Sequence, residues 1–388
     1  MKGLITTVLV LGAALAFPAP RGTSSSLSSL ALQKVLSDAS PIFGPYAKSR
    51  LSTASWMRHY PDSTKLVHMN LPGVHDAQTW NYSQATQDAL KHVTDLDGNT
   101  VYPPEIYRCQ EKSIIDMLNA GIRVFDVRYA YDPTNSTLVF WHSEALMSET
   151  ATVEDVLFGF YRWLDEQPSE TLMLSFQYEG GTTINAKNDA ATQMELFRTL
   201  TTPAAKKYFL QTKDRFGTLG EARGKITLLK RFDLDQLPAS YGDALPGIHF
   251  SPALWTDNGV DIALTYNSAK HLTAYIEDYY QPIAPIGMGA AYNIELKFNA
   301  TTQHLVKASE MYPDSLFWSF ASSNYDVDSP PETPRIMALG NGTELTPKGG
   351  VNQQFVPFLK GLKGKRVGIV MFDFFDTPGD LVQALLDP

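Results

Sequence analysis

The residues of this chain that are best suited to chemistry stand at the ends of short apolar segments. The first such segment, LPGVHD at residues 71–76, ends in His75 and Asp76, an imidazole beside a carboxylate. Histidine can take and return a proton near neutral pH. Pro-Gly marks the end of an extended run, Leu66–Leu71, so we expect the pair to lie at a strand tip, where a His can be held in one orientation.

A second segment, GIRVFDVR at residues 121–128, reads as a strand that carries charge. Strand alternation places Val124, Asp126 and Arg128 on the same face, with Phe125 and Val127 on the other. A guanidinium on a strand can bind phosphoryl oxygens through two parallel donors. A structural ion pair between Asp126 and Arg128 is the alternative interpretation.

Two more apolar runs end in a polar residue: LVFWH ends at His142, and VGIVMFD ends at Asp373. Barrel enzymes keep their chemistry at the carboxyl ends of their strands. Four strand ends that deliver His-Asp, Asp-x-Arg, His and Asp to one rim therefore predict an acid–base site with a cation for phosphate.

The elements that would position these residues alternate along the chain. Expected strands are Leu66–Leu71, Ile122–Tyr129, Leu138–His142, Thr171–Gln177, Ile226–Phe232, Ile248–Ser251, Leu316–Ala321 and Val367–Phe374. Expected helices are Leu30–Leu36, Glu111–Ala120, Val153–Gln167, Ala190–Thr199, Thr301–Met311 and Gln353–Leu362. Thr152 is the expected N-cap of the third helix, and Gly121 suits the end of the second. About eight strands interleaved with helices favour an α/β fold, a distorted TIM-type (β/α)8 barrel, over an open doubly wound sheet.

The amino-terminal residues predict export. Residues 1–16 read as a signal peptide, because a basic Lys2 precedes an apolar run too short to span a bilayer and ending in the small-x-small form of a cleavage site. We expect a lead-in segment at 17–54, one catalytic domain at 55–388, and a secreted, extracellular protein. Four glycosylation sequons agree with this route: Asn81, Asn135, Asn299 and Asn341.

Composition excludes several classes of partner. The formal net charge is −9 and no Lys/Arg cluster stands out, which argues against nucleic-acid binding and against electrostatic capture by an anionic membrane. Cys109 is the single cysteine, so no intrachain disulfide can form, and we expect a buried, unreactive thiol. No nucleotide-binding glycine motif is present, and we expect no cofactor and no stable protein partner. The expected oligomeric state is a monomer.

Four features of the sequence, taken in order, resemble the X-domain pattern of phosphatidylinositol-specific phospholipases C: LPGVHD, GIRVFDVR, the strand-end His142 and VGIVMFDF. The likeness is closest to the metal-independent, bacterial-type branch. It covers roughly residues 55–388 and is weakest over 235–310. It implies a distorted TIM barrel that acts on an inositol phospholipid at a membrane surface.

The resemblance also implies roles for five residues. His75 would be the general base that takes the proton from the inositol 2-hydroxyl, and Asp373 would orient it. His142, assisted by Asp76, would protonate the diacylglycerol oxygen as it leaves. Arg128 would bind the phosphate oxygens and take up the charge that grows there. These are the needs of phosphoryl transfer: an activated nucleophile, a protonated leaving group and charge stabilisation.

A further set of residues is implied to bind the inositol ring: Asp126, Gln177, Glu179, Arg231, Asp278 and Tyr280. Gln177 stands about where the bacterial enzymes tend to have Lys, so the pocket prefers a modified headgroup or binds inositol differently. Surface charge is the alternative interpretation of Arg231 and Asp278.

The segment Ala77–Arg108 departs from the pattern, being long and containing Trp80 and Tyr82. Exposed aromatic rings at the barrel mouth would insert into a lipid surface, although a glycan at Asn81 would oppose this.

The sequence thus predicts a phosphodiesterase that gives a cyclic inositol phosphate and diacylglycerol without metal. A metal-dependent glycerophosphodiester phosphodiesterase on the same barrel is the nearest alternative, but it needs a Glu-x-Asp pair where this strand has Asp126-x-Arg128. The other alternative is a non-catalytic lipid- or glycan-binding protein, which has no use for an acid–base pair.

Overall fold

A computed structural model describes residues 26–49, 51–94, 101–179 and 187–386. The predicted signal peptide, residues 1–16, lies outside these ranges. The strands are β1 (Leu71–Val74), β2 (Val124–Tyr131), β3 (Leu138–His142), β4 (Ala145–Leu146), β5 (Leu172–Tyr178), β6 (Ile226–Arg231), β7 (Ile248–His249), β8 (Ile262–Asn267), β9 (Leu272–Glu277), β10 (Leu316–Phe320) and β11 (Ile369–Phe372).

The α-helices are α1 (Leu27–Phe43), α2 (Gln84–Thr94), α3 (Pro104–Tyr107), α4 (Ile114–Ala120), α5 (Val153–Glu166), α6 (Ala190–Leu200), α7 (Pro203–Tyr208), α8 (Leu219–Ala222), α9 (Ala239–Ala244), α10 (Ala290–Glu310), α11 (Pro334–Leu339), α12 (Val351–Gly361) and α13 (Leu381–Leu386). Short 3-10 turns lie at Ser52–His59, Leu66–His68, Ala77–Thr79, Pro252–Leu254 and Ser268–Lys270. Within the described ranges, no helix is long and apolar enough to cross a bilayer.

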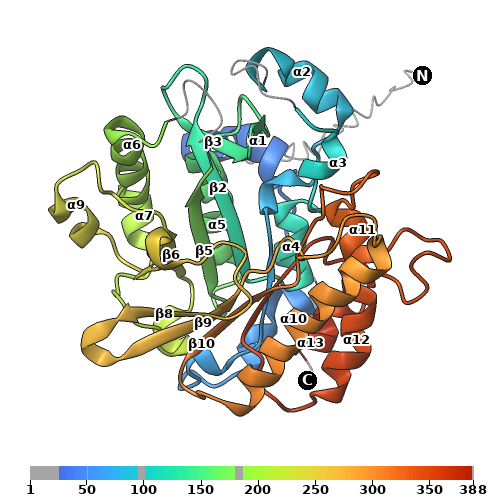
Figure 1. Ribbon diagram of the computed structural model, residues 1–388. Helices are drawn as coiled ribbons and strands as arrows, with labels where there is room; N and C mark the ends of the chain where they lie inside the picture. Colours follow the sequence, from blue (N-terminus) through green and yellow to red (C-terminus); the bar gives the residue numbers. More distant parts are fainter. Residues whose placement is uncertain (1–25, 50, 95–100, 180–186, 387–388) are drawn as a thin grey trace, which may run out of the picture.

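The strands form one curled sheet with helices on its outer face (Figure 1). Their order is β7-β6-β5-β2-β1-β11-β10-β9-β8, and every neighbouring pair from β7 to β9 is parallel. At one end of this order β8 pairs with β9 in the antiparallel direction. Among the described residues no strand pairing connects β7 with β8, so the sheet does not close there. The predicted α/β fold, a distorted TIM-type barrel, is therefore confirmed.

Alternating side chains of each strand fill two cores. Val124 of β2 packs inside the barrel with Met371 and Trp318, while Phe125 and Val127 pack outside against the helices. Because the period of a strand is two, Asp126 and Arg128 share the inner face with Val124. The face assignment made for this strand from sequence is confirmed.

Two predicted helix ends are also confirmed. Thr152 caps α5 through a reciprocal capping box with Asp155. Gly121 follows α4 with a φ of 113°, a left-handed conformation in which a side chain would be strained.

The predicted strand Leu66–Leu71 is wrong. Its residues begin with a 3-10 turn, and β1 starts only at Leu71 and runs through Pro72 and Gly73. The Pro-Gly pair is therefore part of the strand. A Cβ on Gly73 would lie 2.4 Å from the sulfur of Met371, so only glycine lets β1 approach β11 this closely.

Two further strand predictions need correction. Leu138–His142 is a strand, but it pairs antiparallel with the carboxyl-terminal half of β2 and with β4. It is therefore not one of the parallel strands that form the barrel. The hairpin of β8 and β9 was not predicted, and β9 supplies the eighth parallel strand. His142 therefore reaches the barrel mouth on an extension of β2.

The lead-in segment contains a longer helix than expected. In place of Leu30–Leu36, α1 covers Leu27–Phe43 and packs on α5, where the rings of Phe43 and Phe160 lie 5.4 Å apart. Helix α10 likewise begins well before the predicted Thr301.

The prediction that Trp80 and Tyr82 are exposed rings of the segment Ala77–Arg108 is wrong. Trp80 donates its Nε1–H to the carbonyl of Ile42, 2.8 Å away, and Tyr82 is 1% exposed. Asn81 donates to the carbonyl of Pro41 at 2.7 Å. These hydrogen bonds hold the start of the segment against the end of α1. The rings of Trp80 and Tyr82 therefore pack within the protein and are not available to insert into a lipid surface.

Candidate active site

The predicted site residues converge on one cavity of about 580 Å³ at the carboxyl ends of the barrel strands. Nine of the eleven line it: His75, Arg128, His142, Gln177, Glu179, Arg231, Asp278, Tyr280 and Asp373. Asp76 and Asp126 are fully buried behind it, each in contact with Arg128. The structure thus brings together residues that are almost 300 positions apart, as His75 and Asp373 are, 298 positions from each other.

The backbone turns sharply directly after three of these residues. Asp76, Ser143 and Phe374 follow His75, His142 and Asp373, and their φ angles are 43°, 49° and 45°. Non-glycine residues rarely adopt this left-handed conformation, and it recurs at functional sites. In Asp76 the turn brings the carboxylate back toward the cavity wall, although strict alternation would point it outward.

His75 is held between an acid and a cation. Its Nδ1 lies 3.0 Å from Asp373 Oδ1, and its Nε2 lies 2.9 Å from Arg128 Nη2. A guanidinium can only donate, so Nε2 carries the lone pair and Nδ1–H donates to Asp373. Burial, followed by the charge of Arg128, holds the pKa of His75 well below its usual value of 6.5. The imidazole is therefore neutral near pH 7, with its basic nitrogen next to Arg128.

Arg128 is the charge centre of the site. Its Nε lies 2.8 Å from Asp76 Oδ1 and 3.0 Å from Asp126 Oδ2, and its Nη1 lies 3.1 Å from Glu179. Burial alone would lower the pKa of Arg128, but the three carboxylates outweigh burial and raise it well above its usual value. The guanidinium is a permanent cation in a fixed plane, which suits it to phosphoryl oxygens.

His142 lies beside the carboxyl group of Asp76. His142 Nδ1 lies 2.8 Å from the carbonyl oxygen of Tyr107, to which it can only donate, and Nε2 lies 3.2 Å from Asp76 Oδ2. Burial raises the pKa of Asp76 to about 6, so this carboxyl takes up a proton more readily than an exposed aspartate does. A histidine beside such a carboxyl is suited to the role of proton donor.

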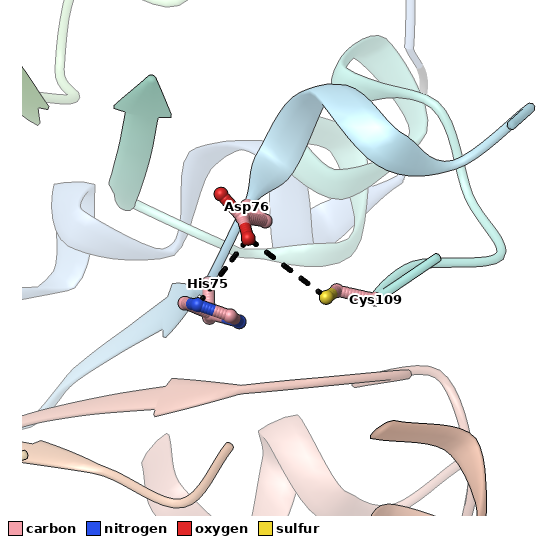
Figure 2. A group of neighbouring side chains, drawn as sticks. All are labelled: His75, Asp76 and Cys109. Carbon is pink, nitrogen blue, oxygen red and sulfur yellow. Dashed lines mark hydrogen bonds and ion pairs between the residues drawn. The ribbon is translucent and has the colours of Figure 1, made fainter. Parts of the chain in front are cut away.

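The residues of the site fit a metal ion poorly. His75, Asp76 and Cys109 are close enough to ligate one (Figure 2), with Cys109 Sγ 3.9 Å from Asp76 Oδ2. However, Arg128 already contacts both His75 Nε2 and the Asp76 carboxylate, and a cation there would face its charge. Burial also raises the pKa of the Cys109 thiol well above its usual value, and a protonated thiol is not a ligand. Cys109 is buried, as predicted.

The neighbouring strands β5 and β6 carry further hydrogen-bonding groups that line the cavity. Arg231 lies over the ring of Trp255, 3.8 Å from its centroid, and its Nη2 is 3.5 Å from Asp278. Its neighbour in register, on β5, is Gln177. Arg231 Nη1 and Gln177 Oε1 are buried without a hydrogen-bond partner among the described residues. A free donor beside a free acceptor matches a hydroxyl group, which both accepts and donates.

Tyr280 lies at the rim of the cavity. Its hydroxyl donates to Asp257 Oδ1 at 3.0 Å, and the residue is 36% exposed.

Three polar residues that complete the site were not predicted. Trp255 donates to Asp278 at 2.7 Å as well as supporting Arg231. The amide of Gln110 donates to the carbonyls of His75 and Phe372, at 2.7 and 2.9 Å, which ties together the ends of β1 and β11. Asn352 donates to the carbonyl of Asp373 at 2.9 Å. No spacing in the sequence marks these residues, because each acts through a fold contact.

Part of the chain is similar to known proteins. The family model "Phosphatidylinositol-specific phospholipase C, X domain" matches residues 89–232. A 1-phosphatidylinositol phosphodiesterase of Listeria monocytogenes is 25% identical over 184 residues, 47% of this chain and 50% of that protein. Residues 89–232 are therefore similar to the phosphatidylinositol-specific phospholipase C X domain. The span matched to the X domain includes Arg128 and His142, while His75 and Asp373 lie outside it.

Other relatives of the X domain cover part of the chain. The 1-phosphatidylinositol phosphodiesterase of Staphylococcus aureus strain Newman is 25% identical over 236 residues, 59% of this chain and 66% of its own. The mouse PI-PLC X domain-containing protein 1 is 32% identical over 128 residues, 30% of this chain and 36% of its own. The chain thus matches only half to two thirds of the bacterial relatives' length.

Solved structures show the same fold. A mutant of the phosphatidylinositol-specific phospholipase C of S. aureus superposes with a TM-score of 0.66 and 18% identity, covering 87% of this chain and 96% of that one. The enzyme of L. monocytogenes gives a TM-score of 0.57 at 21% identity, covering 87% and 98%.

Proposed function

We propose that this protein is a secreted phosphodiesterase that cleaves inositol phospholipids by acid–base catalysis without metal. The observation that carries the proposal is that two histidines meet at one carboxyl group, Asp76, which also contacts the guanidinium of Arg128. The low pKa of His75 leaves its Nε2, next to Arg128, unprotonated, and His142 Nε2 lies 3.2 Å from Asp76, which would supply a proton. Two groups of opposite protonation are what a base and an acid need in one reaction.

The reaction follows from this arrangement. His75 Nε2 takes the proton of the inositol 2-hydroxyl as that oxygen attacks phosphorus, and Asp373 stabilises the imidazolium that results. Arg128 holds the non-bridging oxygens and takes up their growing charge. The proton held by His142 and Asp76 passes to the diacylglycerol oxygen as its bond to phosphorus breaks. The products are a cyclic inositol 1,2-phosphate and diacylglycerol.

The headgroup would lie against the ends of β5 and β6. Arg231 Nη1 and Gln177 Oε1 are the unpartnered donor and acceptor there, and a ring hydroxyl satisfies both at once. The relatives named as phosphatidylinositol phosphodiesterases support inositol as that ring.

Contact with the lipid surface is proposed for the segment that follows β9. Ile283 and Ile286 are 81% and 77% exposed, and they come shortly after Tyr280 at the cavity rim. The segment is held in place because Tyr325 donates to the carbonyl of Ala284 at 2.7 Å and Asp328 accepts from the amide of Gly287 at 2.6 Å. Apolar side chains presented in this way insert into lipid without needing an anionic surface. Vesicle partitioning should therefore fall for Ile283→Asp and stay unchanged in added salt.

Turnover of defined lipids tests the proposal. The purified protein is assayed on phosphatidylinositol and on glycerophosphoinositol, with phosphorus NMR to identify a cyclic product. His75→Ala should lower turnover by ~10²–10⁴, the usual contribution of a general base. His68→Ala is the matched control, because His68 is exposed beside Asp314 and precedes β1 at its amino end. No cyclic product, or equal activity of the two variants, would reject the proposal.

A further inference from the structure

The residues at the end of β9 face the cavity and the covering helix α10 in turn. Ile276 packs inside the barrel, so alternation places Glu277 on the outer face of the sheet. Asp278 and Tyr280 return to the inner side, where both line the active-site cavity. Tyr279 lies between them and is buried. The placement of two cavity residues thus depends on how the backbone at Tyr279 is held.

A buried ion pair holds this backbone from both sides. Lys297 of α10 lies 2.7 Å from Glu277 Oε1, and both side chains are 0% exposed. The same carboxylate oxygen accepts the amide N–H of Tyr279 at 3.0 Å. Lys297 donates to the carbonyl of Tyr279 at 2.8 Å. The N–H and the C=O of one residue are therefore bound by the two members of one ion pair, and hydrogen bonds to charged groups are the strong ones.

The cost of burying this pair indicates that it does more than stabilise the fold. Burial raises the pKa of Glu277, and the charge of Lys297 only partly offsets this. A buried ion pair often stabilises a protein no better than apolar side chains of similar volume would. The pair is better explained by the segment that it holds in place.

That segment carries a carboxylate which contacts the hydrogen-bonding groups of β6. Asp278 accepts from Trp255 Nε1 at 2.7 Å, and its Oδ2 lies 3.5 Å from Arg231 Nη2. Arg231 is also the residue whose Nη1 is buried without a hydrogen-bond partner among the described residues. A shift of the backbone at Tyr279 would therefore move the carboxylate that holds Arg231.

We propose that Lys297 and Glu277 are positioning residues for the headgroup, because the backbone they fix sets Asp278 beside Arg231. The inference rests on the proposed function, in which Arg231 meets a hydroxyl of the inositol ring. Both members of the pair are fully buried, so neither can touch the substrate itself. Their loss should weaken substrate binding and leave the chemical step unchanged.

The chemical step should not depend on Lys297. Its charge does lower the pKa of His75, but by less than burial and Arg128 do. Without Lys297, His75 should therefore still be neutral near pH 7. A rise in KM with kcat unchanged is the expected signature of a residue that acts on binding alone.

Steady-state kinetics on a soluble substrate and on a lipid test the positioning role. For Lys297→Met, the KM of glycerophosphoinositol should rise about tenfold, because the substrate must then supply the ordering that one hydrogen bond to a charged group supplied. The kcat should stay within about threefold of wild type. The KM of phosphatidylinositol in mixed micelles should rise by the same factor. Lys307→Met is the matched control, because Lys307 lies on the same helix and pairs with Asp261 at 2.7 Å.

Two further variants distinguish positioning from a general loss of structure. Glu277→Gln combined with Lys297→Met leaves no buried charge unpaired, and it should reproduce the rise in KM. Glu277→Gln alone keeps an oxygen that accepts the N–H of Tyr279 and keeps Lys297 on the carbonyl, so its KM should stay within about threefold of wild type. Adding Lys297→Met to Asp278→Ala should raise KM little further, because the residue being positioned is already gone. Thermal melting checks that each variant is folded.

A binding measurement separates this inference from the proposed function. Calorimetry with inositol 1-phosphate requires no turnover, and Lys297→Met should weaken its binding by about the same tenfold. If the wild-type protein cleaves phosphatidylinositol and Lys297→Met changes neither KM nor binding, the positioning role is wrong and the function stands. If inositol 1-phosphate binds in a way that depends on Lys297 but no lipid is cleaved, the reverse holds. No binding and no cleavage by the wild-type protein would reject both. A fall confined to kcat, or a rise in KM confined to the lipid, would also overturn the positioning role.

Discussion

Arg128→Lys tests whether the geometry of the guanidinium, and not its charge alone, organises the site. Arg128 contacts four groups through three nitrogens: Nε meets Asp76 and Asp126, Nη1 meets Glu179, and Nη2 meets His75. An ammonium keeps the charge but gathers its donors on one atom at the end of a shorter, unforked chain. It cannot reach both Glu179 and His75 from the position of the carboxylates Asp76 and Asp126.

The magnitude follows from the two hydrogen bonds, to Glu179 and to His75, that an ammonium at this position cannot make. A hydrogen bond to a charged group contributes ~1.5–3 kcal/mol, so removing both costs about 3–6 kcal/mol. At about 1.4 kcal/mol for each factor of ten, kcat/KM should fall by ~10²–10⁴. Most of this fall should appear in kcat, because the guanidinium binds the charge that grows in the transition state.

The assay is steady-state turnover of phosphatidylinositol, with thermal melting to show that the variant is folded. Lys65→Arg is a control of matched chemistry, because Lys65 is exposed and pairs with Asp314 before β1 begins. A kcat/KM of Arg128→Lys within about threefold of wild type would refute the reasoning, because charge would then suffice and the fork would contribute less than ~1 kcal/mol.

Three other results are expected. His142→Ala should lose activity on phosphatidylinositol yet recover on a nitrophenyl ester of inositol phosphate, whose leaving group needs no proton; equal losses on both would exclude His142 as the acid. The pKa of His75 is held below its usual value of 6.5, so an NMR titration of the folded protein should give a pKa below 6.5 for this residue. The contribution of neutral His75 to the free energy of unfolding should be complete above pH 6.5 and should decline as the pH falls toward the pKa of the folded state. A measured His75 pKa above 6.5 would contradict this. Excess EDTA should leave activity intact, since Arg128 fills the position of a cation; loss on chelation and return with Ca²⁺ would show a metal enzyme.

The sequence by itself was sufficient to predict the class of fold and most of the strands that carry the site. A strand of this kind is recognised by apolar and polar side chains that alternate with a period of two and by a polar residue at its end. Both are local properties of the sequence. Thus Asp126 and Arg128 could be assigned to the inner face of β2, and His142 and Asp373 to strand ends, without knowledge of any partner. The capped start of α5 at Thr152 is equally local, because a cap satisfies amide groups within one turn.

Predictions from local patterns were wrong where a neighbouring strand or helix determines the conformation. Pro72-Gly73 is typical of a turn, yet it continues β1 because the close approach of Met371 requires a residue without a side chain. Leu138–His142 has the pattern of a barrel strand, but pairing is set by its neighbour, and that neighbour is the outer half of β2. Trp80 and Tyr82 are apolar in a polar loop, and only α1 packed against them shows why.

What only the tertiary structure decided is the state of each group in the site. A pKa depends on burial and on charges within a few ångströms, and these come from segments far apart in the chain. Burial, and then Arg128 at 2.9 Å on a neighbouring strand, hold the pKa of His75 well below its usual value, and the turn at Asp76 brings a carboxylate to within 3.2 Å of His142. Residue types thus determined which reactions were available, and the packing of the barrel determined which atom holds each proton.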